Sequence, residues 1–153
     1  MSQALLCLPS QGRVIMKKDA KIDRLSQVPM FSACSRKDLG LIARYADELA
    51  VEAGEVIVKE GDAGREFFVL VDGKASVTRN GREIAMLGPG NYFGELSLLD
   101  GQKRDATVTT ASPADLLVVG TREFSALLED VPQITRKLLA GMARRLHELD
   151  TAH

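Results

Sequence analysis

Short runs of alternating apolar and polar residues, separated by turn sequences, fill the middle of this chain and limit its fold more than any other feature. They are rich in Val, Ile, Phe and Thr, which favour strands. The runs cover residues 55–59, 66–71, 74–79, 82–87, 105–110 and 115–119. Asn80-Gly81 is typical of a two-residue hairpin turn, because both central residues need positive φ. Many short strands with regular turns predict an antiparallel sandwich or barrel rather than a parallel sheet.

Helical periods flank the β region on both sides. Ser35 can cap a helix, since Asp38 stands three positions later and apolar residues then follow at helical spacing through Ala46. After the last strand, Thr121 can cap a short helix that runs to residue 130, and Pro132 can open a longer one. The predicted fold class is therefore mainly β with flanking helices, including an N-terminal helix and a long C-terminal helix.

An apolar stripe runs along the predicted C-terminal helix. Its members are separated by three, four and three residues and are Leu139, Met142, Leu146 and Leu149. A stripe of two heptads fits a homodimer seam, but it equally fits packing on the β domain, and the sequence leaves both open. Arg144 and Arg145 lie beside the stripe and are expected to form a solvated face.

Length and charge narrow the function classes. The 153 residues are enough for one domain with its own core. The 20 Lys and Arg residues balance 21 Asp and Glu residues, which argues against a nucleic-acid partner. The apolar run 4–8 is too short to span a membrane, so we expect no membrane partner and a cytoplasmic location. We expect a loose leader over 1–21, a helix with the β domain over 22–130, and a C-terminal lid or dimerisation helix over 131–153.

One segment, residues 90–108, interrupts the strand pattern. A strand is expected to end at Gly94, and a single helical turn is expected to follow and stop at Gly101. Leu96, Leu98 and Leu99 are expected to anchor that turn inward. The free N–H groups of Glu95 to Ser97 would point in one direction and form an anion site, and Gly94 would let a ligand approach the backbone closely.

Two charged residues give this segment its chemistry. Arg104 can clamp a phosphate with two parallel hydrogen bonds, which a lysine cannot do. Glu95 would repel the same anion and is expected to face a hydroxyl donor instead. One anion and one hydroxyl close together describe a phosphorylated ribose. The alternative is that Glu95 and Arg104 pair with each other and Gly94 is only a turn.

The segment resembles the phosphate-binding cassette of the cyclic nucleotide-binding domain family. The resemblance begins with residues 93–99, Arg104 and residues 106–108, and it extends in order over roughly residues 22–149. Further strings that fit are Val-Pro-Met-Phe-Ser at 28–32, Ala-Gly-Glu at 53–55, Glu-Gly-Asp at 60–62, Phe-Phe-Val-Leu at 67–70, Asp-Gly-Lys-Ala-Ser-Val at 72–77 and Leu-Gly-Pro-Gly at 87–90. Each string is short, but together and in order they are specific.

The resemblance implies an eight-stranded jelly-roll barrel that binds a cyclic nucleotide. We expect no other cofactor, no metal and no catalysis, because the two histidines stand near the C-terminal end and no catalytic set is available. It implies that Glu95 binds the ribose 2′-hydroxyl and that Arg104 neutralises the cyclic phosphate. The other ligand-binding positions carried over are Gly94, Leu96, Ser97, Asp105 and Ala106. It also implies that the C-terminal helix swings over the base and transmits binding to an unidentified regulated protein, which requires the ligand to favour one helix position.

Two positions depart from the family pattern. Asp105 stands where Ala, Ser or Thr is usual, and Lys103 stands where proline is common. A hydroxyl after the arginine can favour cGMP in the family, so its absence favours cAMP here. A carboxylate about 5 Å from a phosphate would cost about 3 kcal/mol at an effective dielectric near 20, but strand alternation can turn the Asp105 side chain outward if Arg104 points inward. The positive charge of Lys103 could offset part of that cost.

Three readings compete. The first is a stand-alone nucleotide-sensing module, since residues 147–153 leave no room for the DNA-binding domain that follows this module in some members of the family. The second is a degenerate barrel that has lost its ligand and serves as a protein-interaction or dimerisation module, for which Asp105 is the best evidence. The third, a metal-dependent barrel enzyme, needs histidines on the strands, but the two histidines are His147 and His153 near the C-terminal end.

Overall fold

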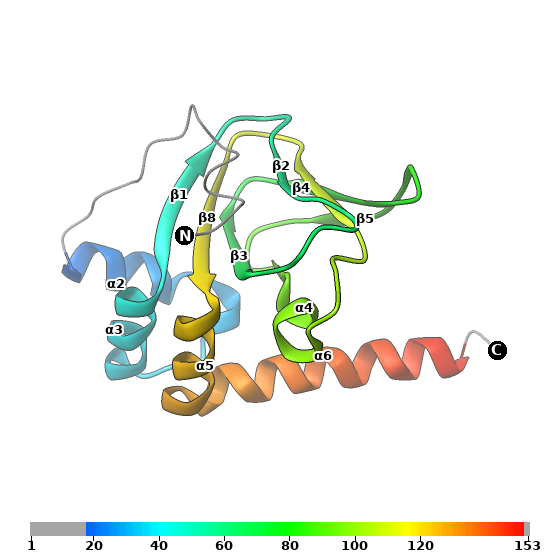
Figure 1. Ribbon diagram of the computed structural model, residues 1–153. Coiled ribbons are helices and arrows are strands. Elements are labelled where there is room, and N and C mark those ends of the chain that lie inside the picture. Colours follow the sequence, from blue (N-terminus) through cyan, green and yellow to red (C-terminus); the bar gives the residue numbers. More distant parts are fainter. Residues whose placement is uncertain (1–17, 152–153) are drawn as a thin grey trace.

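A computed structural model of the protein describes residues 18–151. Eight strands form two four-stranded antiparallel sheets, and helices flank them (Figure 1). The strands are β1 (Asp47–Val51), β2 (Val56–Val58), β3 (Glu66–Asp72), β4 (Ala75–Arg79), β5 (Arg82–Leu87), β6 (Tyr92–Phe93), β7 (Thr107–Thr110) and β8 (Ala114–Gly120). The helices are α2 (Lys18–Ser26), the 3-10 helix η1 (Pro29–Phe31), α3 (Arg36–Tyr45), α4 (Glu95–Asp100), α5 (Thr121–Asp130) and α6 (Pro132–Thr151).

The strand order confirms the predicted jelly roll, as two facing sheets rather than one closed cylinder. The first sheet has the order β1-β8-β3-β6 and the second has the order β2-β7-β4-β5. All predicted strands are present with small shifts at their ends, and the Asn80-Gly81 turn between β4 and β5 has positive φ at both residues. The last strand of the second sheet, β5, leads into the segment 90–108, and the last strand of the first sheet, β6, lies within that segment.

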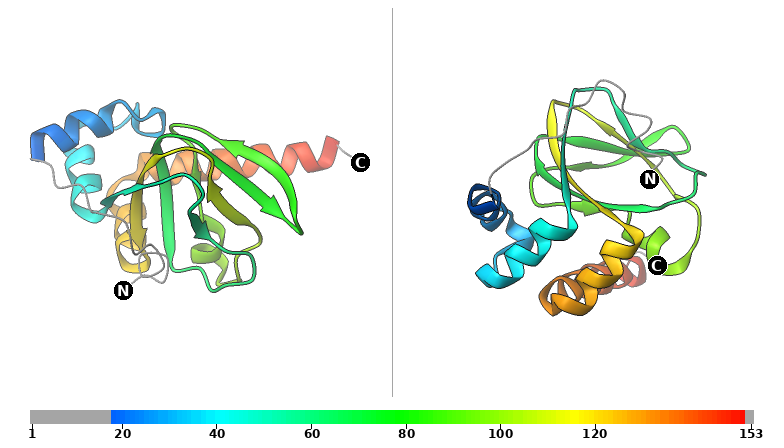
Figure 2. Two further views of the ribbon diagram at one scale, coloured as in Figure 1. Left: turned by 90° about the horizontal axis from the view of Figure 1, so that it is seen from above. Right: turned by 60° about the vertical axis from the view of Figure 1, so that its left-hand side comes forward.

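The core has two layers, one on each side of the first sheet. Alternate residues of its central strands enter different layers: Phe67 and Val69 face the helices, whereas Phe68 and Leu70 face the second sheet. Because β3 and β8 are buried on both faces, they read as continuous apolar runs rather than as alternating ones. Figure 2 shows α2, α3 and α5 gathered at one side of the sheets.

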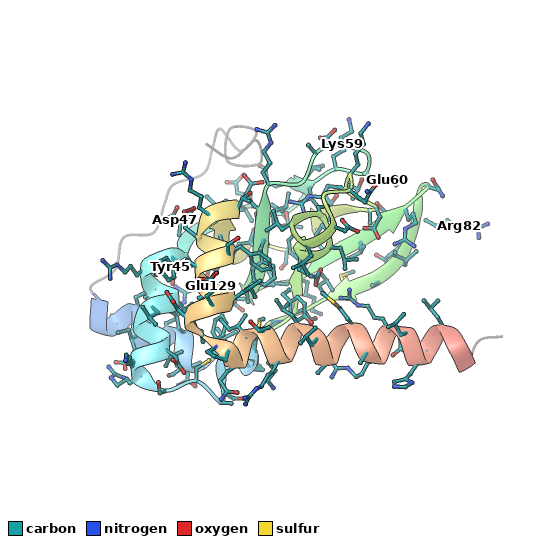
Figure 3. The ribbon with its side chains drawn as sticks, turned by 60° about the horizontal axis from the view of Figure 1, so that its bottom comes forward. Tyr45, Asp47, Lys59, Glu60, Arg82 and Glu129 are labelled. Carbon is teal, nitrogen blue, oxygen red and sulfur yellow. The ribbon has the colours of Figure 1, made fainter. Side chains whose placement is uncertain are left out.

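The helix predicted from Ser35 is confirmed with its cap. The Ser35 hydroxyl accepts the Asp38 N–H at 3.1 Å, and the Asp38 carboxylate accepts the Ser35 N–H at 3.2 Å. Tyr45, at the end of α3, donates its hydroxyl hydrogen to Asp130 of α5 at 2.9 Å. In Figure 3 Tyr45 and Glu129 lie at this junction, at the opposite end of the molecule from Lys59, Glu60 and Arg82.

The N-terminal part differs from the predicted leader over residues 1–21. Residues 1–17 lie outside the described part of the chain, whereas the last four residues of that leader, from Lys18 onward, belong to α2. Lys21 donates from Nζ to the carbonyl oxygens of Ala43 and Ala46, at 2.8 and 2.9 Å, and so ties α2 to the end of α3. A helix with few apolar residues becomes stable here through contacts with α3 that local sequence does not reveal.

Candidate functional site

The segment that breaks the strand pattern forms the predicted turn of helix. Strand β6 ends at Phe93, and Gly94 then adopts a φ of 92°, in the left-handed region that favours glycine. The six-residue helix α4 follows and ends at Gly101, whose N–H donates to the Ser97 carbonyl at 3.0 Å. Phe93 stacks on Phe68 with ring centroids 5.0 Å apart, which fixes the entry to the turn on the core.

The inward anchoring predicted for the three leucines of α4 is wrong for two of them. Leu96 and Leu99 are 38% and 49% exposed, whereas Leu98 packs against the helix-side core. A single helical turn on the surface of a domain can bury only one of its faces. In α4 the buried residues are Glu95 and Ser97, and Leu98 is partly buried, so two polar residues and one leucine face the domain.

Arg104 lies buried beneath this turn, with 6% of its surface exposed. Its Nη1 donates to the Gly94 carbonyl at 2.9 Å, and its Nη2 donates to the Glu66 carbonyl at 2.7 Å. Its backbone is held on the other side by the loop after β2, since Arg104 N–H donates to the Asp62 carbonyl and Gly61 N–H donates to the Arg104 carbonyl, both at 2.8 Å. The guanidinium is therefore fixed in position by main-chain groups before any ligand is present.

Glu95 is also buried, and its Oε2 has no hydrogen-bond partner among the described residues. Burial raises the pKa of this carboxyl, while the charge of Arg145, the backbone N–H groups of Glu95 and Leu96 act in the opposite direction. Arg145 reaches from α6 and places its Nη2 3.8 Å from Glu95 Oε2. A buried carboxylate oxygen without a hydrogen bond is costly unless a donor fills the site.

Arg104 and Glu95 do not form a hydrogen bond or ion pair with each other in the described structure. The hydrogen bonds of Arg104 go to main-chain carbonyl groups, and the ion pair of Glu95 is with Arg145. The expected solvated face at Arg144 and Arg145 is thus wrong for Arg145, which is half-exposed but turned toward the site. The sequence alone does not indicate which of the two neighbouring arginines, Arg144 or Arg145, faces the β domain.

A cavity of about 430 Å³ unites these residues. All seven positions expected from the sequence line it, and they are Gly94, Glu95, Leu96, Ser97, Arg104, Asp105 and Ala106. The rest of its wall was missed. It consists of apolar side chains from β2, β4, β5, β6 and β7, with Arg79 at the end of β4 and with Arg145 and Leu149 of α6. In Figure 1, α6 lies below α4 and the two sheets.

Asp105 lies at the rim of the cavity rather than deep within it. Its side chain is 67% exposed, and its Oδ2 lies 3.3 Å from Nη2 of Arg79. Nε of Arg79 also donates to the Asp105 carbonyl at 2.9 Å. Lys103 is exposed, and its backbone forms an isolated bridge with Ala63. Register between β4 and β7 places Arg79 beside Asp105, but register depends on long-range pairing and cannot be read from either strand alone.

The described residues contain neither a cluster of metal ligands nor a membrane-spanning helix. Within residues 18–151 we find no group of three or more His, Cys, Asp or Glu side chains that could hold a metal ion. No helix in that part of the chain is long and apolar enough to cross a membrane.

Comparison with known proteins agrees with this geometry. The family model described as the cyclic nucleotide-binding domain matches residues 48–131. A cyclic AMP receptor protein of Thermus thermophilus is 32% identical over 127 residues, which cover 80% of this chain and 59% of that protein. A cAMP-dependent protein kinase regulatory subunit of Schizosaccharomyces pombe is 31% identical over 113 residues, which cover 73% of this chain and 27% of that protein.

A solved structure, described as cAMP-bound PfPKA-R, superposes with a TM-score of 0.73 at 28% identity and covers 88% of this chain and 48% of that one. The chain thus spans about half or less of the length of several proteins that it resembles. These relatives are regulatory and binding proteins. The family match takes in most of the β domain, including the whole segment around Glu95 and Arg104. The chain belongs to the cyclic nucleotide-binding domain family.

Proposed function

We propose that this protein is a regulatory module that binds a cyclic nucleotide in the cavity beneath α4, and that it is not an enzyme. The observation that carries the proposal is that one cavity holds both a buried arginine and a buried carboxylate whose Oε2 has no hydrogen bond within the described part of the chain. A ligand with an anion and a hydroxyl would satisfy both. Arg104 would neutralise the cyclic phosphate, and Glu95 would accept a hydrogen bond from the ribose 2′-hydroxyl.

The remaining site residues would shape the approach of the ligand. Gly94 and Ala106 would let the sugar and phosphate come close to the backbone, and the N–H groups of Leu96 and Ser97 would face the phosphate. The apolar wall would receive the base, and it includes Val77, Leu87 and Leu149. Small-molecule sites commonly combine such an apolar lining with a few well-placed polar groups.

We propose cAMP rather than cGMP as the preferred ligand. Asp105 supports this choice because it leaves no hydroxyl at the position after Arg104, where family members with a hydroxyl can favour cGMP. The named relatives support it as well, since they are described as cAMP receptors or cAMP-dependent regulators. A cytoplasmic location follows from the proposal, because cyclic nucleotides are intracellular messengers.

We propose that α6 carries the signal. Arg145 and Leu149 line the cavity although they belong to this separate helix, which supports a coupling between ligand binding and helix position. A ligand hydroxyl at Glu95 would change the contacts of Arg145 and would thereby favour one position of α6 over another. The regulated protein would respond to the position of α6.

Isothermal titration with cAMP and cGMP tests the proposal. We expect saturable heat with both nucleotides and tighter binding of cAMP, together with slower hydrogen exchange in the second half of α6 when cAMP is bound. The degenerate barrel is the competing candidate, and Asp105 beside the anion site favours it. Absence of heat and of any thermal shift at millimolar nucleotide would favour that candidate and end the proposal.

The outer stripe of α6 supports a homodimer as the second part of the proposal. Leu139 and Leu146 are 60% and 63% exposed, and Leu149, which also borders the cavity, is 59% exposed, so the stripe does not pack fully on the β domain. Residues that do pack there come from another face of α6, and they include Ile134 and Leu138. Two heptads of exposed leucine are what a short helix pair would bury.

Replacing Leu139 and Leu146 together with glutamate should therefore convert a dimer into a monomer. Static light scattering on wild type and variant measures the change, and circular dichroism checks that the variant keeps its fold. Both residues are exposed, so we expect less than about 0.5 kcal/mol of destabilisation within the monomer. A wild-type protein that is already monomeric at tens of micromolar would contradict the dimer.

A further inference from the structure

Asp105 and Arg79 form a charged pair at the rim of the cavity, and neither the segment 90–108 nor the family pattern accounts for it. Arg79 ends β4, and Asp105 follows directly after Arg104. Arg79 donates from Nε to the Asp105 carbonyl at 2.9 Å and from Nη2 to Asp105 Oδ2 at 3.3 Å. Both residues line the same cavity as Arg104.

The charge of Asp105 reaches the centre of the site. Burial raises the pKa of Glu95 and lowers that of Arg104, and the negative charge of Asp105 acts upward on both. Five charged side chains line the cavity, and Asp105 and Glu95 are the negative ones. Without Arg79 the cavity would carry no net positive charge, and an uncompensated carboxylate would stand next to the arginine that would take the phosphate.

The hydrogen bond to the backbone gives Arg79 a second effect. The regular pairing of β4 with β7 begins at Thr78 and Thr107, so Asp105 lies outside the ladder. The bond from Nε of Arg79 holds the main chain of this residue to the end of β4. The short stretch between Arg104 and β7 is thus fixed on one side by Arg79 and on the other by the loop after β2, through the bonds of Arg104 with Asp62 and Gly61.

The pair contributes little to folding. The side chains of Arg79 and Asp105 are 47% and 67% exposed, and ion pairs this exposed are usually worth less than about 1 kcal/mol. An arginine with a purely structural role here would change thermal stability slightly and ligand affinity not at all. An arginine that cancels a charge beside the ligand would change affinity, and that change would depend on salt.

We propose that Arg79 is a positioning residue for the ligand: it holds Asp105 at the rim and cancels its charge, so that the cavity accepts an anion although a carboxylate follows Arg104. This inference rests on the proposed binding of a cyclic nucleotide. It explains how the chain keeps an acidic residue where the family has a small neutral one. The chemistry that Arg79 favours is a ligand with at least one negative charge near Arg104.

A double-mutant cycle tests it, with cAMP as the probe in isothermal titration at 50 mM and 1 M NaCl. R79Q should weaken binding about tenfold at low salt, and the loss should shrink below about threefold at high salt. D105N should bind more tightly than wild type, because it removes the carboxylate beside the anion site. The double variant R79Q/D105N should return to within about threefold of D105N, because the charge that Arg79 offsets is then gone. R79K should keep most of the affinity, because its charge remains.

R82Q is the matched control, since Arg82 is an exposed arginine on the paired strand that does not line the cavity, and Figure 3 shows it at the edge of the sheet. It should leave the affinity unchanged. Wild-type protein that binds cAMP while R79Q binds it equally well would overturn the role of Arg79 and leave the proposed function intact. A double variant as weak as R79Q would also overturn it. Wild-type protein that gives no heat with cAMP would overturn the proposed function itself.

Discussion

Replacement of Arg104 by alanine should weaken cAMP binding by about 3–5 kcal/mol, roughly a hundredfold to several thousandfold, because it leaves a buried phosphate without its counter-charge. The guanidinium is already held by the carbonyl groups of Gly94 and Glu66 and has only 6% of its surface exposed. Arg79 and Arg145 also line the cavity, but both are about half exposed, and they pair with Asp105 and Glu95. Isothermal titration of wild type and variant measures the loss.

The same substitution has a second consequence in the unliganded protein. Burial raises the pKa of Glu66, and the positive charge of Arg104 lowers it. Oε2 of Glu66 has no hydrogen-bond partner among the described residues. Without Arg104 the raised pKa of this carboxyl should rise further. A glutamate whose pKa is raised in the folded protein stabilises the fold at low pH, where it is protonated. That contribution is lost as pH rises from the ordinary glutamate pKa through the raised one. The variant should therefore lose more stability than wild type across that pH window.

Arg104→Lys is the companion variant. A lysine keeps the positive charge but has no planar fork with which to donate to Gly94 and Glu66 simultaneously. We expect an affinity between those of wild type and the alanine variant, and a thermal midpoint closer to wild type. A loss of less than tenfold in the alanine variant, with its fold intact by circular dichroism, would show that the phosphate binds elsewhere.

Local sequence signals predicted those parts of the fold whose conformation is decided locally. The Ser35 cap, the Asn80-Gly81 turn and the glycines that bound α4 all have backbone requirements that only a few residue types meet. The central strands were also recognised, because β-branched and aromatic residues dominate them.

Elements that depend on distant partners were missed. Strand β1 has the sequence DELAV and buries Glu48 as well as Leu49, so it shows no alternation of apolar and polar residues. Glu48 is compatible with that burial because Arg24 of α2 lies 3.4 Å away. Arg24 and Glu48 are 24 positions apart, and neither local sequence indicates that the two residues pair.

The candidate site shows the same division. Its seven expected residues lie in one continuous segment, and all of them line the cavity. Arg79, Arg145 and Leu149 come from β4 and α6 and enter the site only because the sheet register and the path of the C-terminal helix bring them there. Arg79 contributes to the charge at the rim, and Arg145 and Leu149 bring α6 into contact with the cavity.

Gly64 lies in the loop after β2, and the structure gives it a larger role in the site than its sequence suggests. A Cβ built at this position would overlap the Cβ of Ser97 and would lie 2.8 Å from Cζ of Arg104. Its backbone does not need positive φ, so the requirement for glycine arises from this close approach and not from strain. The loop can fix Arg104 through Gly61 and Asp62 only if the chain at Gly64 stays in contact with α4.

Gly64→Ala should therefore damage binding and folding together. Overpacking of this kind costs about 1–3 kcal/mol, which corresponds to a fall of roughly 2–12 °C in the thermal midpoint. Because the displaced groups are Ser97 and the guanidinium of Arg104, we expect cAMP affinity to fall at least tenfold. Differential scanning calorimetry and isothermal titration measure the two effects.

Gly88→Ala is the matched control for this prediction. Gly88 also has no need of positive φ, but a Cβ there would meet nothing within 4 Å. That variant should keep the affinity of wild type and unfold within a few degrees of it, and reduced flexibility of the unfolded chain can even stabilise it slightly. If Gly64→Ala bound cAMP as tightly as Gly88→Ala, the loop after β2 would have no part in holding the arginine, and the position of Arg104 would have to be explained by α4 and β3 alone.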